Sequence, residues 1–261
     1  MVRFLKIVSH KIDEFKKNCP REKKCHYFAA IAKKHFIEII AALYIILLAC
    51  INPFTSLYLF FRNVPYYIKN PLLLDLDFFY FYYYHVFYNF ACYIQEKNKT
   101  GIKDIGELTY GETPYFSLAK VFKSIPIKKT DIFYDLGCGR GKLVFFVRKN
   151  YGIPSFGVDI IPTFIKVANK FAQIKKLKNI AFFEDDLKVF DFSKGTIFFM
   201  AWTCLNITTS KKITENLAKI PKTSFVITTS APLNHPDFTI TKKFKVLFTW
   251  GKGHIYINQK K

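Results

Sequence analysis

The sequence predicts an α/β fold with a mostly parallel, seven-stranded sheet that closes with an antiparallel hairpin at the C-terminus. Three observations predict it. From about residue 105 onward, short β-branched and aromatic runs alternate with Lys-rich helical runs, a pattern typical of βαβ units. A glycine-rich turn at 137–141 directly follows the first strand-like run. Near the C-terminus, Gly251-Lys252-Gly253 separates two further strand-like runs, as a hairpin turn would.

This alternation sets the expected order of elements in a single domain, 105–261. Strands are expected at Ile132–Leu136, Ser155–Ile160, Ile180–Glu184, Thr196–Trp202 and Ser224–Thr229. Helices are expected between them at Lys142–Asn150, Pro162–Lys178 and Thr208–Lys219. The closing hairpin is expected to pair Phe238–Trp250 with His254–Asn258. Parallel strands are buried on both faces, which explains why the first five runs are almost continuously apolar.

The N-terminal part of the chain predicts association with a membrane. Residues 1–35 form a basic segment with ten Lys or Arg against three acidic residues. The range 39–61 then holds 23 residues without a charge, enough for a helix to cross a hydrocarbon core of about 30 Å. We therefore expect a transmembrane helix at 36–62. Because Asn52-Pro53 interrupts the run, a shorter, buried core helix is the alternative.

The range 63–104 is expected to form an aromatic juxtamembrane helix and a linker. Phe78–Ile94 is aromatic rather than aliphatic, and Tyr is a residue of membrane interfaces more than of the bilayer centre. This favours a helix that lies at the membrane surface or covers the α/β domain. A second membrane span is the alternative.

Composition restricts the partners of the chain. The net charge of +21 suggests an anionic partner, but it comes from 35 Lys and only 5 Arg. Surfaces that read nucleic acid rely on the planar fork of Arg, so nucleic acid is not the favoured partner. The six Cys form no C-x-x-C pair, which predicts free thiols in a reducing compartment and no metal site.

The stretch Asp135–Gly141, with the sequence DLGCGRG, carries the first chemical signal. A glycine-rich turn after a strand lets the backbone approach a ligand, and the next helix directs its N–H groups at an anion. Asp135 lies at the carboxyl end of the strand, where open α/β sheets bind ligands. The dinucleotide fingerprint fails because its third glycine would be residue 142, which is Lys. The predicted ligand contacts here are Asp135, Gly137, Gly139 and Gly141.

Acidic residues also end the next two strands. Asp159 lies 22 residues after Gly137, where a carboxylate can bind both hydroxyls of a ribose. Asp186 follows the third strand and can accept a hydrogen bond from an adenine amino group, while Leu187 packs on the ring. Three consecutive strands that end in acid predict a nucleoside-like ligand. A flavodoxin-like or nicotinamide-binding sheet is the alternative.

Together these motifs resemble motifs I, II and III of class I S-adenosylmethionine (SAM)-dependent methyltransferases. The range 109–114, TYGETP, resembles the loop of the disruptor-of-telomeric-silencing class of lysine methyltransferases. It is particularly similar to their small bacterial relatives, in which Lys-Asn-Pro, here 69–71, precedes the domain. The resemblance implies a Rossmann-like fold, SAM as cofactor and no metal. It also implies that the 110–113 loop contacts the cofactor through Tyr110, Gly111, Glu112 and Thr113.

The resemblance further implies that the methyl acceptor is a lysine amine of a protein. Such an amine must be neutral to react, and aromatic walls lower its pKa by desolvation. We expect Tyr110, Trp202 and Thr203 to line the acceptor channel. The stretch 201–204, AWTC, is similar to the bacterial relatives and not to the histone enzymes. The alternatives are an enzyme for a membrane-dissolved small molecule, such as a quinone or lipid, and a non-catalytic membrane adaptor.

Membrane lipid is the partner expected for the N-terminal segment, and the expected location is a membrane with the catalytic domain facing the cytoplasm. SAM is a cytosolic cofactor, and the positive-inside rule places the basic range 1–35 on the same side. A single span cannot satisfy both conditions. A hairpin of two spans and a re-entrant or interfacial first segment both stay open.

Overall fold

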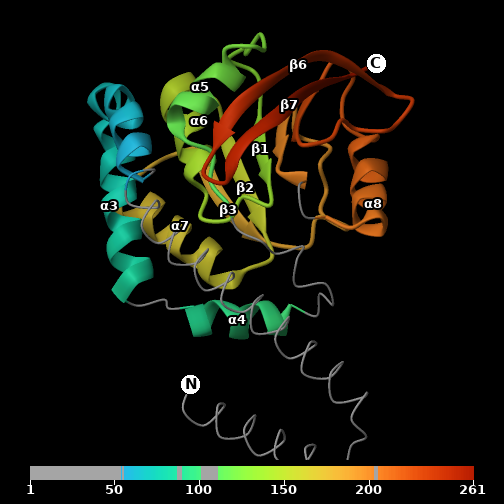
Figure 1. Ribbon diagram of the computed structural model, residues 1–261. Helices are drawn as coiled ribbons and strands as arrows, with labels where there is room; N and C mark the ends of the chain where they lie inside the picture. Colours follow the sequence, from blue (N-terminus) through green and yellow to red (C-terminus); the bar gives the residue numbers. More distant parts are fainter. Residues whose placement is uncertain (1–53, 55, 87–89, 101–110, 203–204) are drawn as a thin grey trace, which may run out of the picture. The chain divides into compact units, whose positions relative to one another are not determined.

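The computed structural model describes residues 54, 56–86, 90–100, 111–202 and 205–261. A seven-stranded sheet lies at its centre, in the order β3-β2-β1-β4-β5-β7-β6 (Figure 1). Strands β1 to β5 are parallel, and β7 is antiparallel to both β5 and β6. This confirms the predicted α/β fold and its antiparallel end. The strands are β1 Phe133–Leu136, β2 Ser155–Asp159, β3 Ile180–Glu184, β4 Ile197–Met200, β5 Phe225–Thr229, β6 Phe238–Phe248 and β7 Gly251–Lys260.

Helices cover both faces of this sheet, and strand β1 shows how the sequence divides them. Phe133 points into the apolar cluster that holds α5, α6 and α7, whereas Tyr134 and Leu136 point into the cluster that holds α8. All four residues of β1 are buried, as expected for the central strand of a sheet covered on both sides. The labelled helices are α3 Pro71–Val86, α4 Phe90–Lys99, α5 Tyr115–Phe122, α6 Lys142–Tyr151, α7 Pro162–Ile174 and α8 Ile207–Leu217. Residues 56–69 are helical as well.

Local signals in the sequence explain where these helices begin and end. Helix α6 begins directly after Gly141 and ends at Gly152, which has a φ of 73° and donates its N–H to the carbonyl of Arg148. Pro162 occupies the first turn of α7. Proline has no backbone N–H, and an N–H at this position would have no partner within the helix. The expected continuation of α7 to Lys178 was wrong, because Lys176 turns into the left-handed region with a φ of 49°.

The hairpin turn differs from the prediction. Gly251 and Gly253 are not the turn but belong to β7, where they pair with Phe248 and Val246 of β6. The turn itself is Thr249-Trp250. At Gly253 a Cβ would lie 2.8 Å from the ring of Phe248. The glycine is therefore explained by a close cross-strand neighbour and not by a turn conformation.

Strand β6 forms one edge of the sheet, and β7 is its neighbour in the sheet. The strand is largely exposed and contains Lys242, Lys243 and Lys245. The pairing with β7 shifts register between Ile240 and Lys242, which marks an irregularity of the β-bulge type. The ammonium of Lys120 on α5 donates to the carbonyl of Lys245 at 2.9 Å. Positive charge and a register shift thus mark this edge.

The range 62–261 forms one compact unit and 1–61 another. The predicted basic segment 1–35 lies outside the described residues, and so does the predicted transmembrane helix 36–62 apart from residues 54 and 56–62. Within the part of the chain that the structure describes, no helix is both long and apolar enough to cross a membrane.

The aromatic segment Phe78–Ile94 is not one continuous described helix, because it divides between α3 and α4. Helix α3 covers the domain with an aromatic face. The ring of Phe79 lies 5.2 Å from that of Phe171 on α7, and Tyr84 lies 6.0 Å from Phe164. Tyr80 is buried beside them, only 3% exposed. These contacts make α3 part of the compact unit that contains the sheet.

Candidate cofactor site

The glycine loop between β1 and α6 follows a backbone path that favours glycine. Gly137, Gly139 and Gly141 have φ values of 77°, 52° and 76°, a region in which a side chain costs about 1–2 kcal/mol. A Cβ on Gly137 would meet nothing within 4 Å, whereas a Cβ on Gly141 would lie 2.3 Å from the ring of Phe182. The loop is therefore packed at its end and open at its start. Cys138, between the glycines, is buried as a free thiol.

Asp135 is the buried acid beneath this loop. Its exposed fraction is 4%, and within the described residues no hydrogen bond is seen to its carboxylate. Burial raises the pKa of Asp135 well above its ordinary value, and the nearby charge of Asp159 raises it further. A buried acid that has no hydrogen-bond donor among the described residues, beside an open glycine turn, has the chemistry expected of a site for a polar ligand.

Asp159, at the end of β2, binds the backbone of the glycine loop through its carboxylate. One carboxylate oxygen accepts from the N–H of Gly139 at 2.8 Å and the other from the N–H of Ile161 at 2.9 Å. Burial raises the pKa of Asp159, and these backbone N–H groups partly offset the rise. Each carboxylate oxygen has a further lone pair, so the carboxylate keeps acceptor capacity. Binding to ribose hydroxyls stays a prediction.

Asp186 and Leu187 lie in the turn that follows β3. One oxygen of Asp186 accepts from the N–H of Lys188 at 2.9 Å, and the other pairs with the ammonium of Lys188 at 3.0 Å. Leu187 is half-buried against the cluster that contains α8. Both residues follow the carboxyl end of a strand adjacent to β2. Their contacts with an adenine stay a prediction.

The segment 111–113 is held in place by the turn between β6 and β7. The N–H of Glu112 donates to the hydroxyl of Thr249 at 3.1 Å, and the N–H of Thr249 donates to the carbonyl of Glu112 at 3.1 Å. A Cβ on Gly111 would lie 2.3 Å from the indole ring of Trp250, so the glycine permits this close approach. Thr113 is half-buried, and Tyr110 lies outside the described residues.

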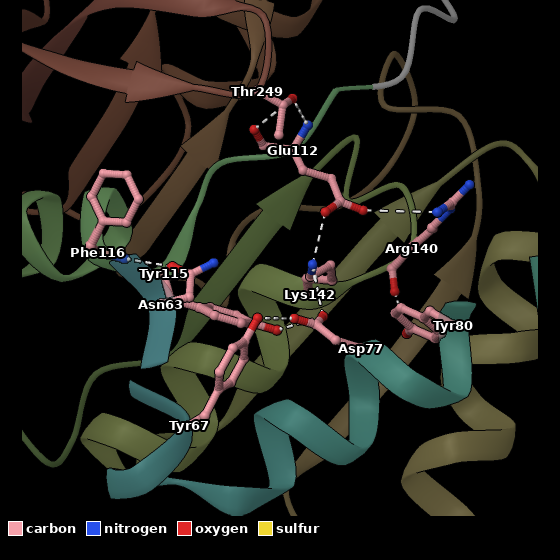
Figure 2. A network of polar contacts seen from close by, with 10 residues as sticks. All are labelled: Asn63, Tyr67, Asp77, Tyr80, Glu112, Tyr115, Phe116, Arg140, Lys142 and Thr249. Atoms are coloured by element: carbon pink, nitrogen blue, oxygen red, sulfur yellow. Dashed lines mark hydrogen bonds and ion pairs between the residues drawn. The ribbon is translucent and has the colours of Figure 1, made fainter. Parts of the chain in front are cut away.

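Figure 2 shows how the side chain of Glu112 reaches the glycine loop. One oxygen lies 2.8 Å from the ammonium of Lys142, and the other lies 3.9 Å from the guanidinium of Arg140. Lys142 is the first residue of α6, and its ammonium also lies 2.7 Å from Asp77 on α3. Burial lowers the pKa of Lys142, but the Glu112 and Asp77 carboxylates outweigh this and raise it above its ordinary value. The ammonium is therefore charged at neutral pH.

A further set of contacts joins α3 to the same cluster (Figure 2). Tyr67 donates its hydroxyl to one oxygen of Asp77 at 2.7 Å, and Tyr115 donates to the other at 3.1 Å. Tyr80 donates its hydroxyl to the carbonyl of Arg140 within the glycine loop. The guanidinium of Arg140 lies over the ring of Tyr84 at 3.9 Å. Helix α3 thus contacts the glycine loop directly.

Of the residues predicted for the acceptor channel, Trp202 alone is described. Its indole N–H donates to the carbonyl of Ala231 at 3.0 Å, and its ring is half-buried against the α8 cluster. Thr203 and Tyr110 lie outside the described residues. The three assignments stay predictions. Among the residues that the structure describes, no group of three His, Cys, Asp or Glu could hold a metal ion.

The structure thus brings the glycine loop, the buried Asp135, the half-buried Asp159 and Glu112 to one end of the parallel strands. Sequence reasoning missed Asp77 and Lys142 as members of the site. In the sequence, Lys142 differs from expectation only in that it replaces the third glycine of the dinucleotide fingerprint. The available signal for Asp77 was an acid within an otherwise apolar run, LLLDLDFF, at residues 72–79.

Comparison with known proteins assigns the chain to a family. Residues 88–243 match the family described as "Histone methylation protein DOT1", which is more than half of the 261-residue chain. A relative from Dictyostelium discoideum, described as "Histone-lysine N-methyltransferase, H3 lysine-79 specific", is 30% identical over 110 residues. The alignment covers 37% of this chain and 6% of that relative. The chain therefore spans only a small part of the relative's length.

Two solved structures show similarity at low sequence identity. An RNA methyltransferase from Salinibacter ruber in complex with S-adenosyl-L-homocysteine is 21% identical, with a TM-score of 0.48 over 56% of this chain and 90% of that one. TrmN from Thermus thermophilus is 13% identical, with a TM-score of 0.48 over 63% of this chain and 52% of that one.

Proposed function

The chain belongs to the DOT1 family of histone methylation proteins, and from this we propose that it is a methyltransferase that uses SAM and methylates a lysine amine of a protein. The observation that carries the proposal is the family match across 88–243, which spans both the 110–113 loop and the glycine loop. The Dictyostelium discoideum relative, described as specific for lysine 79 of histone H3, supports the same type of acceptor. The identity of the protein substrate is a separate question. The stretch AWTC at 201–204 differs from the corresponding motif of the histone enzymes.

The described residues fit the cofactor. We propose that Asp135, Asp159 and the glycine loop hold SAM together with Glu112 and Thr113 of the 110–113 loop, and that Asp186 and Leu187 contact its adenine. The open turn at Gly137 and the buried Asp135 carboxylate, without a described donor, support this assignment. When bound, SAM supplies a methyl group on a sulfonium. The protein then has to align the acceptor with that methyl group and exclude water.

A lysine acceptor must lose its proton before it reacts. We propose that Tyr110, Trp202 and Thr203 line the channel through which the amine enters, because an aromatic wall desolvates an ammonium and lowers its pKa. The orientation of Trp202 supports a fixed wall, since its indole N–H is bound to the carbonyl of Ala231. In this proposal, a ring fixed at this position limits the channel to a narrow side chain.

We also propose that the protein acts at a membrane, with membrane lipid as the partner of the N-terminal segment and the catalytic domain in the cytoplasm. The charge-free range 39–61 supports this location. Exposed aromatic residues on α3 are consistent with a nearby apolar phase: Phe78, Phe81 and Tyr82 are 63%, 63% and 59% exposed. The same feature favours a second candidate acceptor, a quinone or lipid dissolved in the membrane.

Incubation with methyl-labelled SAM and a membrane extract distinguishes these acceptors. Transfer to protein should give a labelled band that resists lipase and nuclease and contains methyl-lysine after hydrolysis. Label that partitions into organic solvent would instead favour the small-molecule acceptor, and label on RNA would contradict both. Absence of SAM binding in calorimetry would support the non-catalytic adaptor.

The matched control replaces the buried acid. Asp135→Ala should abolish SAM binding and all labelling, whereas Asp191→Ala, an exposed acid in the loop before β4, should retain both. Undiminished SAM binding by the Asp135→Ala protein would contradict the site assignment.

A further inference from the structure

Helix α3 carries an acid, Asp77, that lies inside the polar network of the candidate site. We propose that Asp77 is a positioning residue for the cofactor loop: by holding the ammonium of Lys142 it sets the place and the charge of Glu112. The proposal rests on the proposed function, in which Glu112 and the glycine loop hold SAM. It extends the site to a helix that precedes the glycine loop by more than fifty residues.

The Lys142 ammonium is the link between the two carboxylates (Figure 2). It lies 2.7 Å from Asp77 and 2.8 Å from Glu112. Because Lys142 is the first residue of α6, directly after Gly141, its backbone is fixed by the glycine loop. Its side chain is only 21% exposed, so both ion pairs are largely shielded from water and are worth more than surface pairs.

Asp77 is itself held in one position. It accepts hydrogen bonds from the hydroxyls of Tyr67 and Tyr115, one at each oxygen. Tyr115 is buried, and its ring stacks on Phe146 of α6 at 5.9 Å and 13°. A carboxylate with an ammonium and two hydroxyl donors has little freedom to move. It therefore gives Lys142 a fixed partner that does not depend on the 110–113 loop.

Charge explains why this matters for the cofactor. Asp77 offsets the charge of the Lys142 ammonium, so this ammonium neutralises Glu112 less than its short distance of 2.8 Å suggests. The guanidinium of Arg140 also pairs with Glu112, but from farther away, at 3.9 Å. Without Asp77, the Lys142 charge would fall on Glu112 alone. Glu112 would then be drawn toward Lys142 and neutralised by it. The amino-acid part of SAM carries an ammonium, and a neutralised Glu112 offers it less attraction.

The test measures SAM affinity of the full chain by isothermal titration calorimetry. Asp77→Asn should weaken binding about tenfold, which corresponds to about 1.4 kcal/mol. Asp75→Asn is the matched control, because Asp75 lies on the same helix and pairs with Lys175 on the surface at 2.6 Å. Its affinity should equal that of the natural chain. Tyr67→Phe, which removes a hydroxyl donor to Asp77 without a change of charge, should weaken binding about two- to threefold.

A double-mutant cycle separates positioning from simple loss of structure. In a Glu112→Gln background, Asp77→Asn should have no further effect on SAM affinity, because its action passes through Glu112. An equal tenfold loss in both backgrounds would overturn the proposal, as would Asp77→Asn binding SAM like the natural chain. If Asp77→Asn does not fold, Tyr67→Phe decides, and unchanged affinity overturns the proposal. A natural chain that does not bind SAM overturns the proposed function and this inference with it.

Discussion

Two loops meet at the candidate site, and they are built on different principles. The glycine loop owes its path to its own backbone, since its three glycines have positive φ values. The 111–113 segment owes its position to distant partners: Thr249 and Trp250 hold its backbone, and Lys142 holds the side chain of Glu112. The comparison shows that the candidate site combines two kinds of loop. The path of the first is encoded by its own residues, and the second is positioned by contacts with distant parts of the chain.

Of changes in the two loops, the largest effect is expected from breaking the locally encoded one. Gly137→Ala places a Cβ at a φ of 77°, which costs about 1–2 kcal/mol and makes the loop shift away from its path. We expect SAM affinity to fall by at least about tenfold. Gly152→Ala is the control, because Gly152 has a φ of 73° at the opposite end of α6. It should lower the melting temperature similarly and leave SAM affinity unchanged. Equal affinities of the two variants would contradict the role of the loop.

The second prediction concerns the loop held by distant partners. Gly111→Ala would bring a Cβ to 2.3 Å from the ring of Trp250, so the segment must move. We expect SAM affinity to fall by about three- to tenfold, an effect of about 1 kcal/mol. Trp250→Ala removes the obstacle, and the double variant should bind SAM like Trp250→Ala alone. No such suppressor should exist for Gly137→Ala, whose cost lies in the backbone. A double variant weaker than both single ones would refute the distinction.

The smallest expected effect appears in the pH dependence of stability. Burial holds the pKa of Asp135 above its ordinary value of 3.8, so the folded protein binds this proton more tightly than the unfolded chain does. Stability should therefore fall as pH rises from about 4 through the folded-state pKa. Asp135→Asn lacks this penalty and should melt higher than the natural chain at pH 7, by roughly 2–4 °C for each kcal/mol. The difference should vanish near pH 4.

Asp77→Asn should shift the melting temperature in the opposite direction, because it removes a charge that is paired in the folded state. Thermal melts of both variants between pH 4 and 7 check the contrast. Two shifts of the same sign would show that the two halves of the site do not differ in this way.

Much of the fold could be predicted from the sequence because its signals are local. The apolar runs at β1 to β5, Pro162 at the start of α7 and the glycines around α6 all act within a few residues. The error at the hairpin arose where a distant contact decides. Gly253 reads as a turn residue, but it is required by the ring of Phe248 across the hairpin.

The same division applies to the site. Asp135 and Asp159 were found because carboxyl ends of parallel strands meet at one edge. Asp77 and Lys142 were missed because their ion pair joins residues that are 65 positions apart in the sequence. An acid within an aromatic run predicts no particular partner. The aromatic segment Phe78–Ile94 was likewise open to interpretation as a helix at the membrane surface or over the domain, or as a second span. The contacts of Phe79 and Tyr84 with α7 place α3 on the domain.

The Lys-rich strand β6, with its register shift, has a consequence for how molecules of this protein behave in a crowded solution. An exposed strand at the end of a sheet is a template for pairing with the sheet of another copy, the first step of aggregation. Here a second molecule would have to bring its backbone against Lys242, Lys243 and Lys245 and follow the register shift at Ile240. Like charges and a broken ladder oppose that contact. The edge strand of the sheet therefore also opposes the pairing of further strands from other molecules.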